Sequence, residues 1–147
     1  MYKEYSPCSV LAPFIYHFWE YKGETRSGLK FNIPPHGCSD LVFIVGNAAD
    51  CIRNSLIMKP YHSYFFGPMN TFTELVAHTN FIHIIGVRFR PCGLFQFIEI
   101  PLNELANQGI DSQEFPVLFS QSFIYQLCES NQNPIDIIEH ELEILGC

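Results

Sequence analysis

The stretch that most constrains the fold of this chain is residues 81–93, FIHIIGVRFRPCG. Its β-branched and aromatic residues predict a strand that is buried on both faces at its start. Arg88 and Arg90 make the far end of one face basic, so that end should lie near a rim or cleft. Pro91 and Gly93 stop the strand, because proline cannot extend a hydrogen-bonded ladder and glycine permits a turn. At a period of two, one face carries Phe81, His83, Ile85, Val87 and Phe89, and the other carries Ile82, Ile84, Gly86, Arg88 and Arg90.

The segments before Pro91 predict further short strands, because turn signals recur every 8–14 residues and no convincing 3.6-residue period is present. Residues 1–13 contain Ser6-Pro7 and Ala12-Pro13, which interrupt regular structure, so we predict an arm there. This spacing favours a small antiparallel barrel or sandwich. The predicted strands are residues 14–22, 29–33, 41–45, 51–58, 64–66 and 71–77.

After Gly93 the pattern becomes helical. Pro101 suits the first turn of a short helix that would run to Asn107 and end at Gly109. A second helix is predicted from one apolar stripe, and a last helix begins at Asn133-Pro134, an N-cap followed by a first-turn proline. The predicted fold class is therefore α+β, with a small antiparallel barrel over residues 1–93 and a helical segment packed on it over residues 94–147. The stripe of the second helix comprises Phe119, Phe123, Ile124 and Leu127.

The last predicted helix carries an apolar seam of four residues spaced by three, four and three: Ile135, Ile138, Leu142 and Leu145. The seam is barely two heptads long, so it cannot hold two chains together as an isolated coiled coil. It could pack against the helix of residues 119–127 in its own chain, or it could form a dimer interface supported by the barrel. Of the two we favour the dimer interface.

Charge is distributed unevenly along the chain. All eight lysine and arginine residues lie at or before Arg90, together with six acids, whereas the rest of the chain holds nine acids and no lysine or arginine. A nucleic-acid interface needs clustered cations to neutralise phosphate. This chain by itself should therefore not bind duplex DNA specifically.

Composition and cysteine spacing indicate a folded cytoplasmic domain. Hydrophobic residues make up 48 % of the chain and charged residues 16 %, which argues against disorder. No apolar run approaches the roughly 18 residues that span a bilayer, and the first ten residues lack the apolar core of an export signal. The six cysteines include no CxxC pair, so we expect reduced thiols and no membrane partner.

No known catalytic or cofactor motif is present. The chain lacks GxGxxG, GxxxxGK, GxSxG and HExxH sequences, and none of its six histidines forms the HxH pair common in barrel metal sites. Cys38 lies near His36, but a buried thiol beside a turn explains that spacing better than a nucleophile does. We therefore expect no metal, no cofactor and no enzymatic activity.

The most informative polar residues are Asp40 and Arg88, because each interrupts an otherwise apolar strand. A buried carboxylate requires a cation, and arginine can bind it through two parallel hydrogen bonds. We predict that the two side chains are neighbours, either as a structural pair between strands or as groups that face a ligand. Aromatic residues such as Tyr16, Trp19 and Phe43 could line a pocket, although most would simply fill the barrel.

Four stretches together resemble the N-terminal domain of a group of AraC-type bacterial transcriptional regulators. Relatives have aspartate where this chain has His36 and often glycine where it has Cys92, so their ligand chemistry does not transfer. The resemblance covers most of residues 10–115, and relatives continue beyond the position of Cys147 into a helix-turn-helix half. The matching stretches are LAPFIYHFWE (11–20), PPHGCSDLVF (34–43), GPM (67–69) and GVRFRPCGLFQFIEIPLNEL (86–105).

The resemblance implies a cupin-like barrel that senses a small-molecule effector, forms a homodimer and reaches DNA only through a C-terminal domain that this sequence lacks. The alternatives are a cupin-like metalloenzyme, and a truncated interaction protein that pairs with full-length relatives. The candidate ligand-binding residues are Tyr16, Trp19, His36, Asp40, Phe43 and Arg88. The candidate dimerisation residues are Ile135, Ile138, Leu142 and Leu145.

Overall fold

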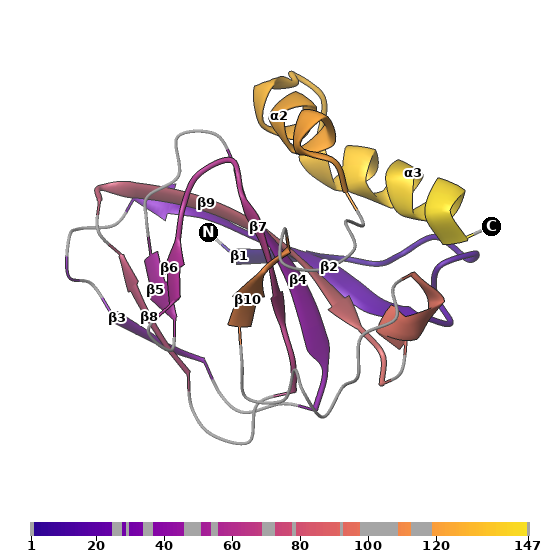
Figure 1. Ribbon diagram of the computed structural model, residues 1–147, viewed down its shortest axis with the longest axis horizontal. Helices are drawn as coiled ribbons and strands as arrows, with labels where there is room; N and C mark the ends of the chain where they lie inside the picture. Colours follow the sequence, from indigo (N-terminus) through magenta and orange to yellow (C-terminus); the bar gives the residue numbers. More distant parts are fainter. Residues whose placement is uncertain are drawn as a thin grey trace.

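In the part of the chain that the structure describes, ten strands form two antiparallel sheets, and two helices follow them (Figure 1). The structure is a computed structural model. It describes residues 2–24, 28, 30–33, 37–45, 51–53, 56–68, 73–77, 79–91, 93–97, 109–112 and 119–146. The predicted α+β class, a small antiparallel cupin-like barrel followed by C-terminal helices, is confirmed.

The large sheet has β9 near its centre, as the sequence of that strand predicts. β9 pairs with β2 on one side and with β4 on the other, and all six residues of β4 are buried. Strands without polar alternation can only sit where both faces are covered, which explains why these apolar runs occupy the middle of the sheet. In order across the sheet, the strands are β1 (Tyr2–Tyr5), β2 (Ile15–Glu24), β9 (Phe81–Phe89), β4 (Ser39–Ile44), β7 (Ser63–Phe66) and β10 (Gly109–Asp111).

The small sheet covers one face of the large sheet. Met58 and Ala77 from the small sheet pack with Val42, Ile44 and other large-sheet residues in a single buried cluster. This face of the large sheet is therefore the interior of the barrel. In order across the small sheet, the strands are β3 (Lys30–Ile33), β8 (Thr73–Ala77), β5 (Cys51–Arg53) and β6 (Leu56–Met58).

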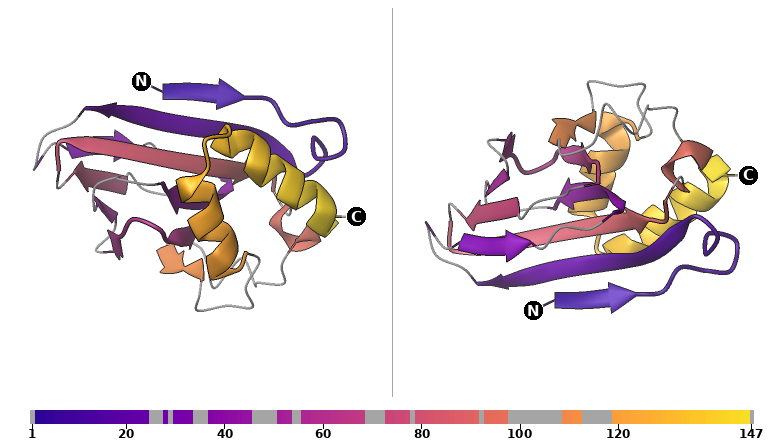
Figure 2. Two further views of the ribbon diagram at one scale, coloured as in Figure 1. Left: turned by 90° about the horizontal axis from the view of Figure 1, so that it is seen from above. Right: turned by 90° about the horizontal axis from the view of Figure 1, so that it is seen from below.

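The helices α2 (Gln121–Glu129) and α3 (Pro134–Gly146) cover the opposite face of the large sheet. They lie in front of that sheet when it is seen from above and behind it when it is seen from below (Figure 2). Asn133 caps α3 as the sequence predicts, since its side chain accepts from the Ile135 amide. Ser120, which was not predicted as a cap, accepts from the Phe123 amide at the start of α2. No helix in the described ranges is both long and apolar enough to cross a membrane.

The apolar seam of α3 packs inside its own chain. Ile138 and Leu142 are fully buried and Ile135 is nearly so, all within the cluster that joins α3 to the large sheet, whereas Leu145 is 39 % exposed. A side chain enclosed by its own sheet cannot also be buried against a second copy. The structure thus gives Ile135, Ile138 and Leu142 the role of core packing, the alternative to the favoured dimer interface, and leaves Leu145 at the surface.

Several local predictions need correction. Residues 2–5 of the predicted arm form an edge strand, and Gly109 begins β10 instead of ending a helix, so the segment after residue 93 contributes a strand to the barrel sheet. The predicted strand of residues 51–58 is a hairpin of two short strands. A short 3-10 helix, η1 (Gly93–Gln96), follows β9. The helix predicted over residues 101–107 lies outside the described residues.

Candidate functional site

The barrel interior contains a buried ion pair between neighbouring strands. Arg88 on β9 lies directly opposite Asp40 on β4, and its Nε and Nη2 donate to the two carboxylate oxygens at 3.0 and 3.1 Å. This is the predicted pairing of Asp40 with Arg88. Asp40 is 1 % exposed and the Arg88 side chain 23 % exposed, so the pair is open to the surroundings only from the arginine side.

Electrostatics keep Arg88 protonated. Burial lowers the pKa of Arg88, but the hydrogen bond and the charge of Asp40 outweigh burial, so the pKa is raised above its ordinary value. The neighbouring Cys38 thiol also has a raised pKa, through burial first, with the Asp40 charge adding to it and the two arginines Arg88 and Arg90 opposing it. The rim beside the pair therefore carries a neutral thiol and a permanent cation.

Two buried nitrogen atoms beside the pair have no hydrogen-bond partner among the residues that the structure describes. They are His17 Nε2 and Trp19 Nε1, both on β2. His17 lies directly opposite Arg88 in the sheet, and Trp19 lies opposite Gly86. Glu4 Oε2 is 3.6 Å from His17 Nε2, which suffices for a weak ion pair but is too long for a hydrogen bond. Unsatisfied buried polar atoms are rare and costly, so these two atoms mark a place where an acceptor is expected.

Gly86 makes room for the indole ring. A Cβ atom built on Gly86 would overlap the side chain of Trp19, so the ring lies flat against the backbone of β9. The ring of Tyr2 stacks on its other side, with centroids 6.3 Å apart. Trp19 is thus held between β9 and the edge strand β1, with its Nε1 buried.

The edge strand β1 closes this side of the site. Tyr2 donates its hydroxyl proton to Glu4 at 2.9 Å, and burial together with this carboxylate raises the pKa of Tyr2 to about 12. The charge of Arg88 acts in the opposite direction on Tyr2, which places the phenol within the electrostatic range of the ion pair. The site therefore combines a cation, a carboxylate and two donor nitrogens on the barrel face of four strands.

Two of the predicted ligand-binding residues point elsewhere. A register irregularity between Ile15 and His17 makes Tyr16 an extra residue in β2, so it is 44 % exposed and its ring lies 4.4 Å from the Arg90 guanidinium carbon. Phe43 lies on the other face of β4, fully buried against Phe119 under the helices. The structure thus excludes both from the barrel site.

Of the remaining predictions, Trp19, Asp40 and Arg88 come together in the barrel, whereas His36 lies outside the described residues. His17, Tyr2 and Gly86 were missed. These three residues were missed because their positions depend on strand register. His17 and Gly86 come to the site through the pairing of β2 with β9, and Tyr2 through the pairing of β1 with β2. A single glycine in an otherwise β-branched strand was a usable signal for a close approach by a large ring.

A second polar group lies on the helix-covered face of the large sheet. His83 Nε2 is 2.6 Å from Glu20 Oε2, and the Tyr5 hydroxyl donates to the other oxygen of the same carboxylate at 3.0 Å. Because the carboxylate is an acceptor, Nε2 of His83 carries the proton in this contact. The three residues come from three adjacent strands, and they are separated from the barrel site by the thickness of the sheet.

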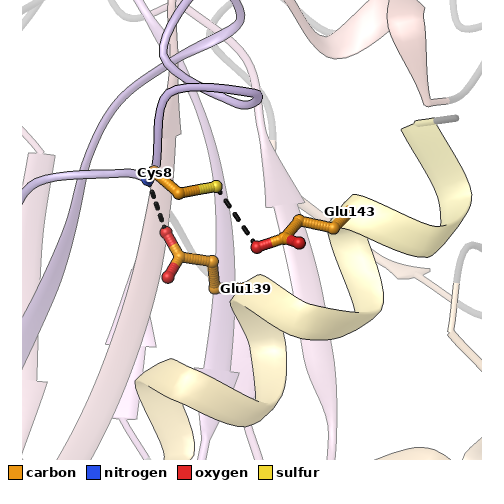
Figure 3. Close-up of side chains that lie close together, drawn as sticks. All are labelled: Cys8, Glu139 and Glu143. Carbon is orange, nitrogen blue, oxygen red and sulfur yellow. Dashed lines mark hydrogen bonds between the residues drawn. The ribbon is translucent and has the colours of Figure 1, made fainter.

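A third group joins the N-terminal segment to α3 (Figure 3). The Cys8 amide donates to Glu139 at 2.8 Å and the Cys8 thiol donates to Glu143 at 3.2 Å. In the described part of the chain, only these three residues bring three potential metal ligands within 4.8 Å of one another. Burial raises the pKa of the Cys8 thiol, and the hydrogen bond to Glu143 raises it further, so without a bound metal the thiol is neutral. The two hydrogen bonds of Cys8 join the N-terminal segment to α3.

One protein family matches most of this chain. A family model described as "Domain of unknown function (DUF6597)" matches residues 3–111. No curated protein matches the sequence. Among solved structures, the cupin_2 domain of an XRE family transcriptional regulator from Enterobacter cloacae is 12 % identical, with a TM-score of 0.48 over 62 % of this chain and 96 % of that one. A cupin 2 conserved barrel domain protein from Salinispora arenicola CNS-205 is 13 % identical, with a TM-score of 0.45 over 65 % and 79 %. None of these matches names an AraC-type regulator.

Proposed function

We propose that this chain, which belongs to the DUF6597 family, a domain of unknown function whose matched region holds the barrel-site residues except Tyr2, contains a ligand-sensing barrel. The ligand is a small polar molecule that binds between the sheets and presents acceptor oxygens. The observation that carries the proposal is the pair of buried nitrogens of His17 and Trp19, which find no hydrogen-bond partner in the described part of the chain, beside the Asp40–Arg88 ion pair.

The chemistry of the ligand follows from these groups. His17 and Trp19 would each donate to a ligand oxygen, and such donors reject analogues that lack the oxygen because their buried N–H groups would then stay unpaired. The guanidinium of Arg88 is partly exposed beside them and can add a charge-assisted hydrogen bond. Hydroxy acids and polyhydroxylated molecules fit this set of donors best.

Sensing requires that ligand binding favour one arrangement of barrel and helices. The sequence stretches that resemble AraC-type regulators support a regulatory role together with a helix-turn-helix module, and this is the context in which we propose the barrel acts. We also propose that the chain forms a homodimer. Because the α3 seam is buried in its own chain, two copies would have to meet through other surfaces.

Trp19 is the only tryptophan of the chain, so its fluorescence reports directly on the site. We expect a member of a panel of hydroxy acids and hexoses to change this fluorescence saturably and to raise the melting temperature. His17→Phe keeps the ring shape but removes the donor, and should weaken binding of that ligand by about tenfold or more. Tyr125→Phe, at a residue 53 % exposed on α2, is the matched control and should bind normally. A ligand that binds His17→Phe as tightly as the wild type would remove the barrel site from the mechanism.

A further inference from the structure

A second pocket, of about 440 Å³, lies on the helix-covered face of the large sheet, away from the barrel site. One wall is formed by the ends of β2 and β9, and the other by the end of α2 and the turn that leads into α3. Its volume falls in the range of small-molecule sites. The residues that line it include Lys22, Val45, His83, Leu127, Asn131 and Gln132.

The sheet wall of this pocket is cationic. Lys22 lies directly opposite His83 across β2 and β9, and both side chains line the pocket. Glu20 holds His83 through one oxygen and accepts from Tyr5 through the other, so its two oxygens are engaged behind the pocket wall. This carboxylate fixes the orientation of the histidine ring without itself lining the pocket.

The helical wall adds neutral donors. Asn131 and Gln132 line the pocket just before α3, and Pro134 at the first turn of α3 directs the positive end of the helix dipole to the same side. Among the described residues that line the pocket, none is aspartate or glutamate, although the chain after Arg90 contains nine acids and no lysine or arginine. A pocket lined by Lys22 and by neutral donors, with no carboxylate among its described residues, favours an anion.

The floor of the pocket is apolar. Leu127 is 1 % exposed and Val45 5 % exposed, and Phe81 at the start of β9 borders the opening. We propose that this pocket binds a small monocarboxylate with an apolar body, its carboxylate between Lys22 and the turn before α3 and its body on Leu127 and Val45. This site is distinct from the barrel site and does not depend on it.

The test uses 4-phenylbutyrate as the probe and 4-phenylbutan-1-ol as its neutral counterpart, titrated into the whole chain by calorimetry and by amide NMR. We expect the acid to bind with a dissociation constant below about 1 mM and the alcohol about tenfold more weakly. Amide shifts should concentrate at the ends of β2 and β9 and in residues 127–134. Shifts confined to the strands around Asp40 would place the probe in the barrel and overturn the proposal.

Two variants test separately the charge of Lys22 and the space inside the pocket. Lys22→Met keeps the apolar stem and should weaken the acid about tenfold while leaving the alcohol unchanged. Lys30→Met is the control, since Lys30 is a 65 % exposed cation on the small sheet, and should bind both probes normally. Gln132→Trp, at an exposed position on the pocket rim, should block both probes. Equal affinities for acid and alcohol, or normal binding by Gln132→Trp, would contradict the proposal.

Discussion

The ion pair in the barrel can be tested by a double-mutant cycle on Asp40 and Arg88. Arg88→Met leaves a carboxylate that is 1 % exposed without its guanidinium, and loss of one partner of a buried pair costs about 3–5 kcal/mol. Asp40→Leu leaves an arginine that is 23 % exposed and can turn towards water, so we expect a smaller loss of about 1–3 kcal/mol. These two values rest on the unequal burial of the partners.

The double variant Asp40→Leu/Arg88→Met removes both charges and fills the space with apolar atoms. Such replacements are often neutral or stabilising, so its free energy of unfolding should lie within about 1 kcal/mol of the wild type. The two single losses would then fail to add, with a coupling energy of about 3 kcal/mol or more.

Urea unfolding followed by circular dichroism measures all four proteins, with equal m-values as the check on two-state behaviour. The exposed pair of Lys30 and Glu74, whose nearest atoms are 3.9 Å apart, serves as the reference cycle and should couple by less than about 1 kcal/mol. If the coupling of Asp40 with Arg88 is no larger than in this reference, the pair does not join the two strands. The same double variant should fold yet fail to bind the barrel ligand, because the site has lost its cation.

Three further predictions follow from individual side chains. Gly86→Ala should displace the indole of Trp19, shift its fluorescence to the red and destabilise the fold by about 1–3 kcal/mol; an unchanged spectrum would disprove the packing of Trp19 on β9. Ile138→Ala should cost about 2–5 kcal/mol in urea unfolding, whereas Ile144→Ala, at a residue 57 % exposed, should cost less than about 0.5 kcal/mol; equal losses would place the α3 seam outside the core. The pKa of Tyr2 is raised from 10.0 to about 12, so the contribution of this shift to stability is complete below pH 10 and is lost as the pH rises towards 12. Tyr2→Phe should therefore flatten the pH dependence of the free energy of unfolding between pH 10 and about 12. Parallel pH curves of the wild type and the variant would refute the shift.

The centre of the fold could be predicted from sequence because its strands are apolar on both faces. β4 and β9 have no polar alternation, so burial on both sides was the only arrangement available to them. The same reasoning identified Asp40 and Arg88, since two charged residues in such strands must meet a partner. The pairing of Asp40 with Arg88 is therefore the part of the site that residue type and position in the strand were enough to predict.

The orientation of β2 was not predictable in the same way. Strict alternation groups Ile15 with His17 and Trp19, but the irregularity at Tyr16 returns Ile15 to the face of Phe18, where both are buried. One extra residue reverses the face of everything beyond it, and an aromatic-rich strand carries no local signal for such a bulge. Tyr16 is the extra residue at this irregularity, and its exposed side chain lies outside the candidate site.

The edge strands were missed for a different reason. β1 and β10 are short, and each pairs along only one side, with β2 and β7 respectively. Short segments beside prolines or glycines are assigned to strands mainly by tertiary pairing, which local sequence does not contain. Tyr2 entered the site only through that pairing.

The large sheet is a shared wall between the two proposed ligand sites, and this has a mechanical consequence. In β9, Arg88 faces the barrel while its neighbours Val87 and Phe89 pack in the cluster that contains α2 and α3. A ligand that shifted the β9 backbone at Arg88 would therefore also shift residues in contact with the helices, because alternate side chains share one backbone. The pocket beside Lys22 lies against that same helical layer. Close packing transmits such shifts without requiring a flexible hinge, so the helices can respond to either site through the strand that both sites share.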